Sequence, residues 1–398
     1  MSIHPDLSHK GQQRRVISTL SRVALCIALL FATGACATKR RVIENPNLNH
    51  WDWERMRHRN LFSSEFPYRN AVSEFDSVDF LKPHERKPRT YRFVHNPKGD
   101  IDRTLGYDAS EYTTTPDFSL LCCPTHAIQV TWIRHATLLI QLGGEFQILT
   151  DPVLAPIDGY VGYLMKFSDT FELHAEPPVT IQDLPFADES EEKKTNIVAI
   201  SHDHHDHLNW NTIKELATNT HFYVPLGLER EFPSRFPYVT GMDWYTKDIL
   251  GDLTIHFLPA NHRSGRSLHE MNQTLWGGWL FEWNDYRVYF AGDTGYSAAF
   301  KDIKNRLGEF DICLMPISAW FQRNWHFAPE DAIRAAQDLG CKTFIPWGYG
   351  TWIISYEHIL EPLRRLQYAW KKMRPENMGL RILKMGETFS LDALSDKK

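Results

Sequence analysis

The sequence lacks the short motifs that mark several large enzyme classes. It contains no Gly-x-Ser-x-Gly segment, no Walker phosphate loop and no glycine-rich dinucleotide fingerprint. The first absence removes the usual serine nucleophile of α/β-hydrolases. The other two remove phosphate-loop NTPases and dinucleotide-dependent enzymes. Hydrolytic chemistry in this chain would therefore need another source of nucleophile.

A surplus of positive charge is also missing. Lys and Arg number 44 against 49 Asp and Glu, which gives a formal net charge of −5. This balance argues against non-specific binding to nucleic acid. Hydrophobic residues make up 42% and charged residues 23% of the chain, which is ordinary for a soluble protein.

Cysteine is scarce, with six residues in 398, and none has the spacing of a zinc ribbon. Cys313 and Cys341 lie in apolar surroundings and are expected to be buried thiols. Cys122 and Cys123 are adjacent, and adjacent cysteines seldom pair with each other. The sequence leaves their disulfide status open.

The N-terminus reads as a targeting segment. Arginines precede an apolar stretch at residues 23–31, and residues 33–36 read Thr-Gly-Ala-Cys. This pattern resembles a bacterial lipoprotein signal at 1–36, cleaved before Cys36 and lipidated on it, although Thr33 stands where Leu is usual. A cleaved secretory signal and a short uncleaved anchor remain open, because the run is shorter than the about 20 residues of a membrane span. The prediction is a periplasm-facing protein of the cell envelope, anchored to the outer membrane by lipid, or an exported one.

The remaining chain predicts one α/β unit. Residues 37–125 hold few periodic segments and are expected to wrap the core at 126–390 as an N-terminal extension. About 250 residues suit one α/β sandwich. Apolar runs predict strands at 130–133, 137–142, 146–149, 197–200, 254–258, 279–283, 287–291 and 312–315. Helices are predicted at 211–217 and 329–339.

The most informative stretch is residues 202–207, where four histidines and two aspartates directly follow the apolar run 197–200. Burying several titratable groups at the end of a strand is costly unless something binds them. Neutral imidazole and ionised carboxylate are common metal ligands. A histidine-rich surface loop is the alternative, because such tracts also occur outside enzymes.

The spacing His-x-His-x-Asp-His favours two adjacent metals over one. In an extended segment His202 and His204 point the same way. The chain must then turn before Asp206 and His207 can reach a second point. Asp203 and His205 are read as orienting or outward-facing residues between these ligands.

Further blocks, in order along the chain, identify the sequence as similar to the metallo-β-lactamase superfamily. Within it, the chain most resembles the N-acyl-phosphatidylethanolamine-hydrolysing phospholipase D branch, over roughly residues 126–390. The blocks are Val-Thr-Trp-Ile-Arg-His-Ala-Thr at 130–137, Thr-Asp-Pro at 150–152, the histidine block, Tyr-Val-Pro-Leu-Gly-Leu at 223–228, Pro-Ala-Asn-His at 259–262, Phe-Ala-Gly-Asp-Thr-Gly-Tyr at 290–296, Phe-Asp-Ile at 310–312, Met-Pro-Ile at 315–317 and Tyr-Glu-His at 356–358. The resemblance implies an αββα four-layer sandwich with an N-terminal extension.

The resemblance also implies a two-zinc centre. The first-metal ligands correspond to His202, His204 and His262 in this sequence. The second-metal pair corresponds to Asp206 and His207, and Asp293 matches a bridging carboxylate. Taken alone, His262 and Asp293 would read as a loop histidine and a turn aspartate.

One departure from the family pattern affects the second metal. Pro346 occupies the position assigned to the family's last histidine ligand, directly before Trp-Gly. His358 or Tyr349 could substitute, water could complete a weaker site, or only the first site could fill. The expectation is a weakened second site.

Two cations beside a bridging carboxylate lower the pKa of bound water and neutralise charge on an attacked phosphoryl or carbonyl oxygen. The resemblance therefore implies a phosphodiesterase that uses a metal-bound hydroxide, with Asp206, Asp293 and His326 as catalytic residues. His326 would bind phosphate or protonate the leaving oxygen. His135 is read as a structural or orienting histidine.

Substrate and partners are less constrained than the chemistry. The expected substrate is an N-acyl-phosphatidylethanolamine-like phospholipid, and aromatics at residues 160–167 are candidates for contact with acyl chains or a membrane. A lactonase and a catalytically weak metal-binding lipoprotein remain alternatives, since the fold does not fix the substrate. The oligomeric state stays open, a homodimer included.

Overall fold

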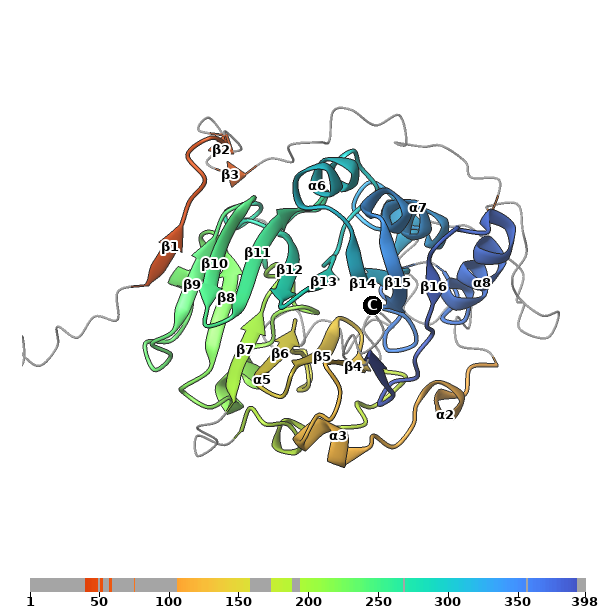
Figure 1. The fold of residues 1–398 in the computed structure, drawn as a ribbon, viewed down its shortest axis with the longest axis horizontal. Coiled ribbons are helices and arrows are strands. Elements are labelled where there is room, and N and C mark those ends of the chain that lie inside the picture. The colour runs from red at the N-terminus through yellow and green to blue at the C-terminus, as the bar shows by residue number, and fades with distance from the viewer. Residues whose placement is uncertain are drawn as a thin grey trace, which may run out of the picture. The chain divides into compact units, whose positions relative to one another are not determined.

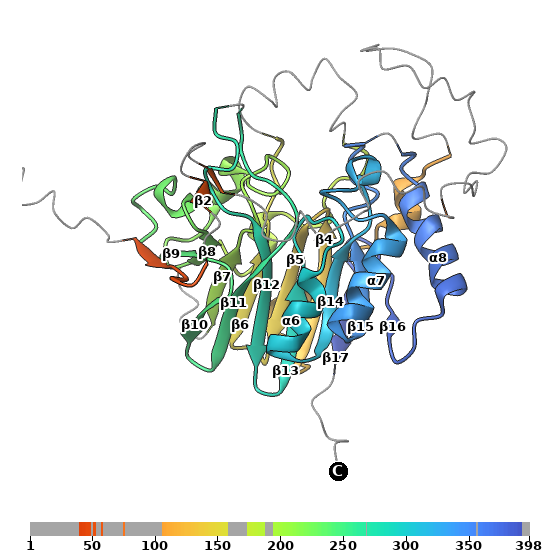
Figure 2. The same ribbon diagram turned by 90° about the horizontal axis from the view of Figure 1, so that it is seen from above.

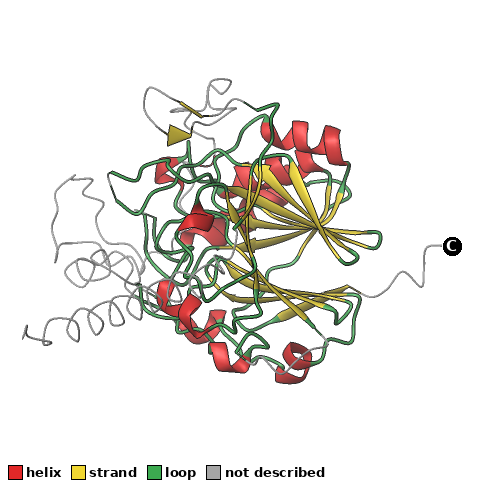
Figure 3. Cartoon of the chain, turned by 90° about the vertical axis from the view of Figure 1, so that its left-hand side faces the viewer, coloured by secondary structure: helices red, strands yellow, loops and turns green. Residues whose placement is uncertain are grey.

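Two β-sheets packed face to face form the centre of the computed structural model (Figure 3). The structure describes residues 40–48, 51–52, 57–58, 75, 106–157, 173–187, 194–267, 269–355 and 357–391. The proposed signal with Cys36 and the aromatic loop at 160–167 lie outside these residues. Residues 40–398 form one compact unit.

The first sheet has eight strands in the spatial order β1-β9-β8-β7-β6-β5-β4-β17 (Figure 1). Strands from β6 through β9 and β1 run parallel, whereas β4, β5 and β17 pair antiparallel. The strands are β1 Arg41–Ile43, β4 Ile128–Arg134, β5 Thr137–Leu142, β6 Phe146–Thr150, β7 Thr195–Ala199, β8 His221–Pro225, β9 Val239–Met242 and β17 Thr388–Leu391.

The second sheet has seven strands in the order β10 to β16. Strands β10 to β13 pair antiparallel, and β13 to β16 run parallel. The strands are β10 Thr246–Leu250, β11 Leu253–Pro259, β12 Gly277–Trp283, β13 Tyr286–Phe290, β14 Phe310–Pro316, β15 Cys341–Trp347 and β16 Gly379–Leu380. A separate ribbon pairs β2 Trp51–Asp52 with β3 Arg57–His58.

Alternation along the strands explains why the sheets stack. In β7, Ile197 and Ala199 face the core between the sheets, whereas Val198 points to the opposite face and packs with Ile213 of helix α5. Successive side chains of a strand point to opposite faces, so a strand that is apolar throughout needs a layer on each side. The all-apolar run at 197–200 is therefore the sequence signature of a strand with both faces covered.

Helices supply the two outer layers (Figure 3). Helices α6 and α7 lie across the outer face of the second sheet beside β14, with α8 next to α7 (Figure 2). The helices are α2 Ala109–Tyr112, α3 Phe118–Cys122, α5 Trp210–Glu215, α6 Ala299–Leu307, α7 Pro329–Leu339 and α8 Glu361–Met373, with single 3₁₀ turns η3 Ile181–Asp183, η4 Leu228–Arg230 and η5 Trp320–Gln322. The mixed α/β fold with two stacked sheets is the predicted fold class. Within the described ranges, no helix combines the length and apolar character needed to cross a bilayer.

Strand β1 and Phe75 of the N-terminal extension contact the core. Strand β1 pairs parallel with β9, and Arg41 forms an ion pair of 2.5 Å with Asp248. Phe75 is fully buried, and its ring meets Tyr368 of α8 edge-on at 6.1 Å between centroids. The domain boundaries at 36, 125 and 390 stay predictions.

The structure corrects the expectation for Cys313 and Cys341. Both are buried, as predicted, but they are joined by a disulfide. Their strands, β14 and β15, are parallel neighbours, and the two Cα atoms lie 6.0 Å apart, within the usual range for a disulfide. Sequence alone could not place the two cysteines on adjacent strands. Cys122 and Cys123 are exposed, and their Sγ atoms lie 2.7 Å apart.

Replacing both Cys313 and Cys341 by alanine is expected to lower the free energy of unfolding by about 3.5 kcal/mol. The disulfide closes a loop with a sequence separation of 28, and chain entropy gives that magnitude. Urea unfolding of the two proteins measures the difference. Peptide mapping without reductant must recover the cross-linked peptide pair; its absence contradicts the pairing.

Candidate metal centre

Two neighbouring clusters of histidine and aspartate lie where the strands of both sheets end. From the first sheet come the turn between β4 and β5, the residue after β6 and the loop after β7. From the second sheet come the loops after β11 and β13 and the segment before α7. The side chains are His135, Asp151, His202, His204, Asp206, His207, His262, Asp293 and His326.

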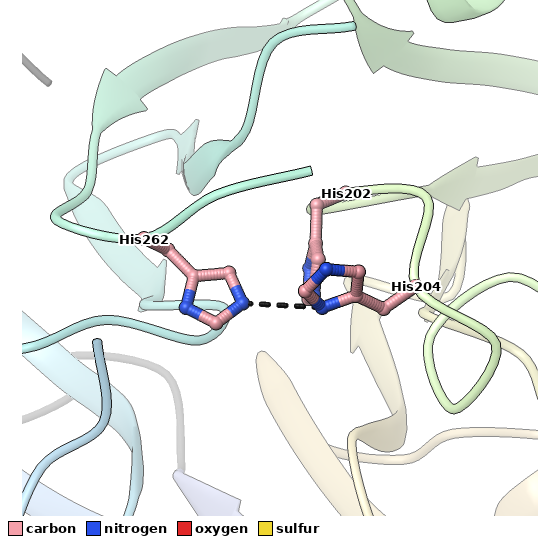
Figure 4. A group of neighbouring side chains, drawn as sticks. All are labelled: His202, His204 and His262. Atoms are coloured by element: carbon pink, nitrogen blue, oxygen red, sulfur yellow. Dashed lines mark hydrogen bonds between the residues drawn. The ribbon is translucent and has the colours of Figure 1, made fainter. Parts of the chain in front are cut away.

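The first cluster consists of His202, His204 and His262 (Figure 4). Nε2 of His202 lies 2.8 Å from Nδ1 of His204, and Nε2 of His262 lies 3.3 Å from the same Nδ1. Nitrogen ligands about 2.05 Å from a tetrahedral metal are separated by roughly 3.3 Å. The three converging nitrogens therefore fit one transition-metal ion.

Burial sets the protonation of this cluster. It lowers the pKa of His204 to about 3 and holds the pKa values of His202 and His262 well below their usual range. All three imidazoles are therefore neutral at pH 7, which is the form that binds a metal. A backbone carbonyl fixes the third ring, because Nδ1 of His262 donates to the carbonyl oxygen of Trp325 at 2.9 Å.

The loop after β7 turns as the spacing predicted. The backbone N–H groups of His207 and Leu208 donate to the carbonyl of His204 at 3.1 and 2.8 Å. This tight turn carries Asp206 and His207 away from the first cluster to a second one. There, Nε2 of His207 lies 3.8 Å from Oδ2 of Asp206, and His135 completes the group.

Asp293 lies between the two clusters. Its Oδ2 is 3.3 Å from Nε2 of His207, 3.9 Å from Nε2 of His262 and 3.5 Å from Nδ1 of His326. Burial by itself would raise the pKa of Asp293, but the three neighbouring imidazoles hold it well below its usual range. An ionised carboxylate in contact with both clusters has the position expected of a bridging ligand.

Glycine is required on both sides of Asp293. Gly292 has φ +61°, and a Cβ there would lie 2.7 Å from Cβ of Ser201. A Cβ at Gly295 would lie 2.2 Å from the carbonyl oxygen of Asn324. The backbone thus passes too close to its neighbours for any side chain at either position.

His326 lies on a loop that hydrogen bonds and ion pairs hold against the metal centre. Nδ2 of Asn261 donates to the carbonyl of Asn324 at 2.9 Å, so the loop is tied to the segment that carries His262. Arg323 forms ion pairs of 2.6 Å with Asp331 and 2.8 Å with Glu330 at the start of α7. These contacts fix the loop, and the side chain of His326 remains 17% exposed.

Asp151 is a site residue to which sequence reasoning gave no role. It is fully buried, and its Oδ2 lies 2.6 Å from Nδ1 of His207 and accepts from Oγ of Ser201 at 2.6 Å. Its Oδ1 accepts from the backbone N–H of Ser201 at 2.6 Å. The available signal was its position directly after an apolar strand, like that of the histidine block.

The two residues between the predicted ligands differ in role. Asp203 is buried and accepts from the backbone N–H of Gly265 at 2.6 Å and from Oγ1 of Thr274 at 2.8 Å. His205 lies 3.4 Å from the carbonyl of Arg266. Asp203 therefore anchors the histidine loop to residues 264–274, an orienting role as predicted.

The structure places Pro346 and the residues considered as its substitutes. Pro346 is buried within β15 and pairs with Met315 of β14. The hydroxyl of Tyr349 donates to the carbonyl of Leu383 at 3.1 Å, and Nδ1 of His358 accepts from the N–H of Leu360 at 3.2 Å. Among the described residues, His358 belongs to no group of converging His, Cys, Asp and Glu ligands. Substitution by His358 or Tyr349 stays one of the alternatives for the second site.

The family model and the similar proteins point to the same family. Residues 147–349 match the β-lactamase superfamily domain. The chain is 34% identical over 270 residues to an uncharacterized protein of Mycobacterium tuberculosis, covering 64% of this chain but 66%, just under two thirds, of the relative. It is 31% identical over 256 residues to N-acyl-phosphatidylethanolamine-hydrolyzing phospholipase D 1 of Caenorhabditis elegans, covering 60% of this chain and 68% of the relative.

Two further similarities cover a short relative and a solved structure. The chain is 38% identical over 97 residues to outer membrane protein RomA of Klebsiella pneumoniae, which covers 24% of this chain and 72% of the relative. The structure of isothiocyanate hydrolase from Delia radicum gut bacteria superposes with a TM-score of 0.51 at 21% identity. That match covers 67% of this chain and all of the other, and it supports the fold.

Proposed function

Because this chain belongs to the metallo-β-lactamase superfamily and is a metal-dependent hydrolase of that fold, we propose that it is a zinc phosphodiesterase of phospholipase D type. Its substrate class is N-acyl-phosphatidylethanolamine-like phospholipids. Water is added across the bond between phosphorus and the head-group oxygen. The hydroxyl stays on phosphorus, which gives phosphatidic acid, and the proton goes to the departing N-acylethanolamine.

The position of Asp293 carries this proposal. Its Oδ2 lies within 3.9 Å of imidazole nitrogens from both clusters and within 3.5 Å of His326. One carboxylate thus connects two metal-type donor sets beside a solvent-accessible imidazole. The similarity to the phospholipase D of Caenorhabditis elegans supports the phosphodiester class.

The donor set suits Zn²⁺, because imidazole nitrogen and carboxylate oxygen are its usual protein ligands. His202, His204 and His262 would hold one ion, and Asp206 with His207 the other, with Asp293 shared. When bound, the two ions would lower the pKa of water and neutralise charge on the phosphoryl oxygens.

The chain's own groups would orient these ligands and the substrate. Asp151 accepts the Nδ1 proton of His207, which leaves Nε2 as the free donor atom of that ring. Burial lowers the pKa of His326, so its ring is neutral at pH 7 and can donate an N–H to a phosphoryl oxygen. Neighbouring imidazoles lower the pKa values of Asp206 and Asp293 despite their burial, so both carboxylates are ionised at pH 7.

Access to a phospholipid requires a membrane surface. We therefore keep the proposal that Cys36 carries a lipid anchor and that the chain works at the outer membrane, facing the periplasm. The similarity to RomA, a protein named for the outer membrane, supports that location.

The test is hydrolysis by the purified full-length protein with N-acyl-phosphatidylethanolamine in mixed micelles, with metal content measured on the same sample. Release of phosphatidic acid and N-acylethanolamine by protein holding about two Zn²⁺ is expected, with loss of turnover after chelation and recovery on adding zinc. An N-acyl-homoserine lactone serves as the competing substrate. Turnover of the lactone alone would overturn the phosphodiesterase assignment in favour of a lactonase.

A further inference from the structure

The second cluster contains a histidine that the predicted ligand set leaves out. Nε2 of His135 lies 3.3 Å from Oδ2 of Asp206, and the ligand atoms of His135, Asp206 and His207 lie within 4.8 Å of one another. His135 comes from the turn between β4 and β5, more than 60 residues before the histidine block. We propose that His135 is a ligand of the second metal and replaces the histidine lost at Pro346.

The spacing of the cluster is that of a tetrahedral zinc site. Ligands about 2.05 Å from a tetrahedral ion are separated by roughly 3.3 Å. The His135–Asp206 distance is 3.3 Å, the His207–Asp293 distance is 3.3 Å and the His207–Asp206 distance is 3.8 Å. Two imidazole nitrogens and one carboxylate oxygen thus lie within 4.8 Å of one another, and a second carboxylate, that of Asp293, is 3.3 Å from His207.

Hydrogen bonding points to an occupant at that place. The Nε2 atoms of His135 and His207 are both buried, and each faces a carboxylate oxygen at 3.3 Å without a well-formed hydrogen bond to it. Buried polar atoms are normally well hydrogen-bonded, so this geometry needs an explanation. A cation between these two nitrogens would satisfy both atoms.

The backbone of His135 has a conformation that residues other than glycine rarely adopt. Its φ is 43°, in the left-handed region that non-glycine residues usually avoid. The carbonyl of His135 accepts from Nε1 of Trp132 at 2.9 Å, and its N–H donates to Oγ1 of Thr351 at 3.2 Å. Strained residues fixed by their surroundings in this way cluster at functional sites.

Thr351 connects His135 to the segment that follows Pro346. It lies four residues beyond the end of β15, the strand that contains Pro346. That segment therefore supplies a hydrogen-bond acceptor that holds the backbone of His135, and no metal ligand. The ring of His135 also packs against Trp352, with 4.9 Å between centroids, which limits its rotation. With His135 as a ligand, the second site has His135, Asp206 and His207 as ligands and Asp293 beside His207. Its affinity for a metal then does not depend on a histidine at position 346.

The inference rests on the two-metal part of the proposed function, but its test uses metal binding and no substrate. His135→Asn removes the imidazole, and Asn tolerates left-handed backbone better than most residues. Zn²⁺ binding is followed by competition with a chromogenic chelator on the full-length protein. Wild type should bind two ions, and the variant should bind the first normally and the second about 100-fold or more weakly.

Two matched variants assign the sites. His204→Asn should weaken the other ion, and His205→Asn, in the same loop but outside both clusters, should leave both ions bound. If His135→Asn binds two ions with wild-type affinity, or wild type binds one, the inference is overturned. Two ions without phospholipid turnover would instead overturn the proposed function and leave this inference standing.

A measurement on wild type covers the case in which His135→Asn does not fold. In crystals of the zinc-loaded protein, anomalous scattering locates each ion. The second ion should lie about 2.1 Å from Nε2 of His135. An ion coordinated by Asp206, His207 and Asp293 but lying beyond about 3 Å from that nitrogen would make His135 only a partner of Asp206.

Discussion

Asp293→Asn is expected to lower kcat/KM about 1000-fold or more while leaving the fold intact. Asparagine keeps the shape of the side chain but loses the charge and one oxygen ligand between the two clusters. A loss of about 4 kcal/mol of transition-state stabilisation corresponds to that factor. Steady-state kinetics on the phospholipid substrate, with Tm measured on the same samples, provide the comparison.

The matched control for this variant is Asp252→Asn, at an exposed aspartate in the turn between β10 and β11. It makes the same chemical change away from the centre and should retain wild-type turnover. If Asp293→Asn also retained turnover within a factor of about three, well under 1 kcal/mol, Asp293 would have no part in the reaction.

Asp151→Ala is expected to lower the free energy of unfolding of the metal-free protein by about 4 kcal/mol. The carboxylate is fully buried and contacts His207 and two donors of Ser201, each at 2.6 Å. Removing one member of a buried, hydrogen-bonded charge pair leaves the others without partners. Asp151 also has φ 35°, where alanine is disfavoured.

Urea unfolding after chelation measures this effect, and Asp151→Asn separates its two causes. Asparagine accepts the left-handed backbone and fills the same space, so its loss should be smaller than that of alanine. A further drop in affinity for one Zn²⁺ is expected in both variants, because His207 loses the acceptor that orients its ring. Stability equal to wild type in Asp151→Ala would show that this buried contact contributes nothing.

The sequence predicted the strands whose composition is strongly apolar. Residues 137–142 and helix 329–339 were predicted with their observed bounds, and the run at 197–200 lies within one residue of the end of β7. Strand β10, Thr246–Leu250, was missed because its Lys and Asp give no apolar run. Helix α8 was missed because its apolar stripe is diluted by charged residues, and packing on α7 stabilises it. Both elements are stabilised by tertiary contacts, because β10 pairs with β11 and α8 packs on α7.

The site residues also differ in how far the sequence alone could predict them. His202, His204, Asp206 and His207 are local in sequence, and a strand followed by a turn is enough to separate them into two pairs. Asp151 and His135 depend on distant contacts: β6 must lie beside β7, and the β4–β5 turn must approach Asp206. From the sequence, His135 was read as a structural or orienting histidine, because metal-bound residues need orienting partners. Only the three-dimensional arrangement shows that Nε2 of His135 lies beside Asp206 and His207.

The candidate ligands come from residues 135 to 326, in loops of both sheets. During synthesis, the complete centre can therefore not assemble until the chain has emerged beyond His326 and both sheets have docked. A chain held unfolded for transport would carry only scattered histidines with little affinity for an ion. The metal that such a protein acquires is then determined by the compartment in which it folds, and not by the one in which it is made.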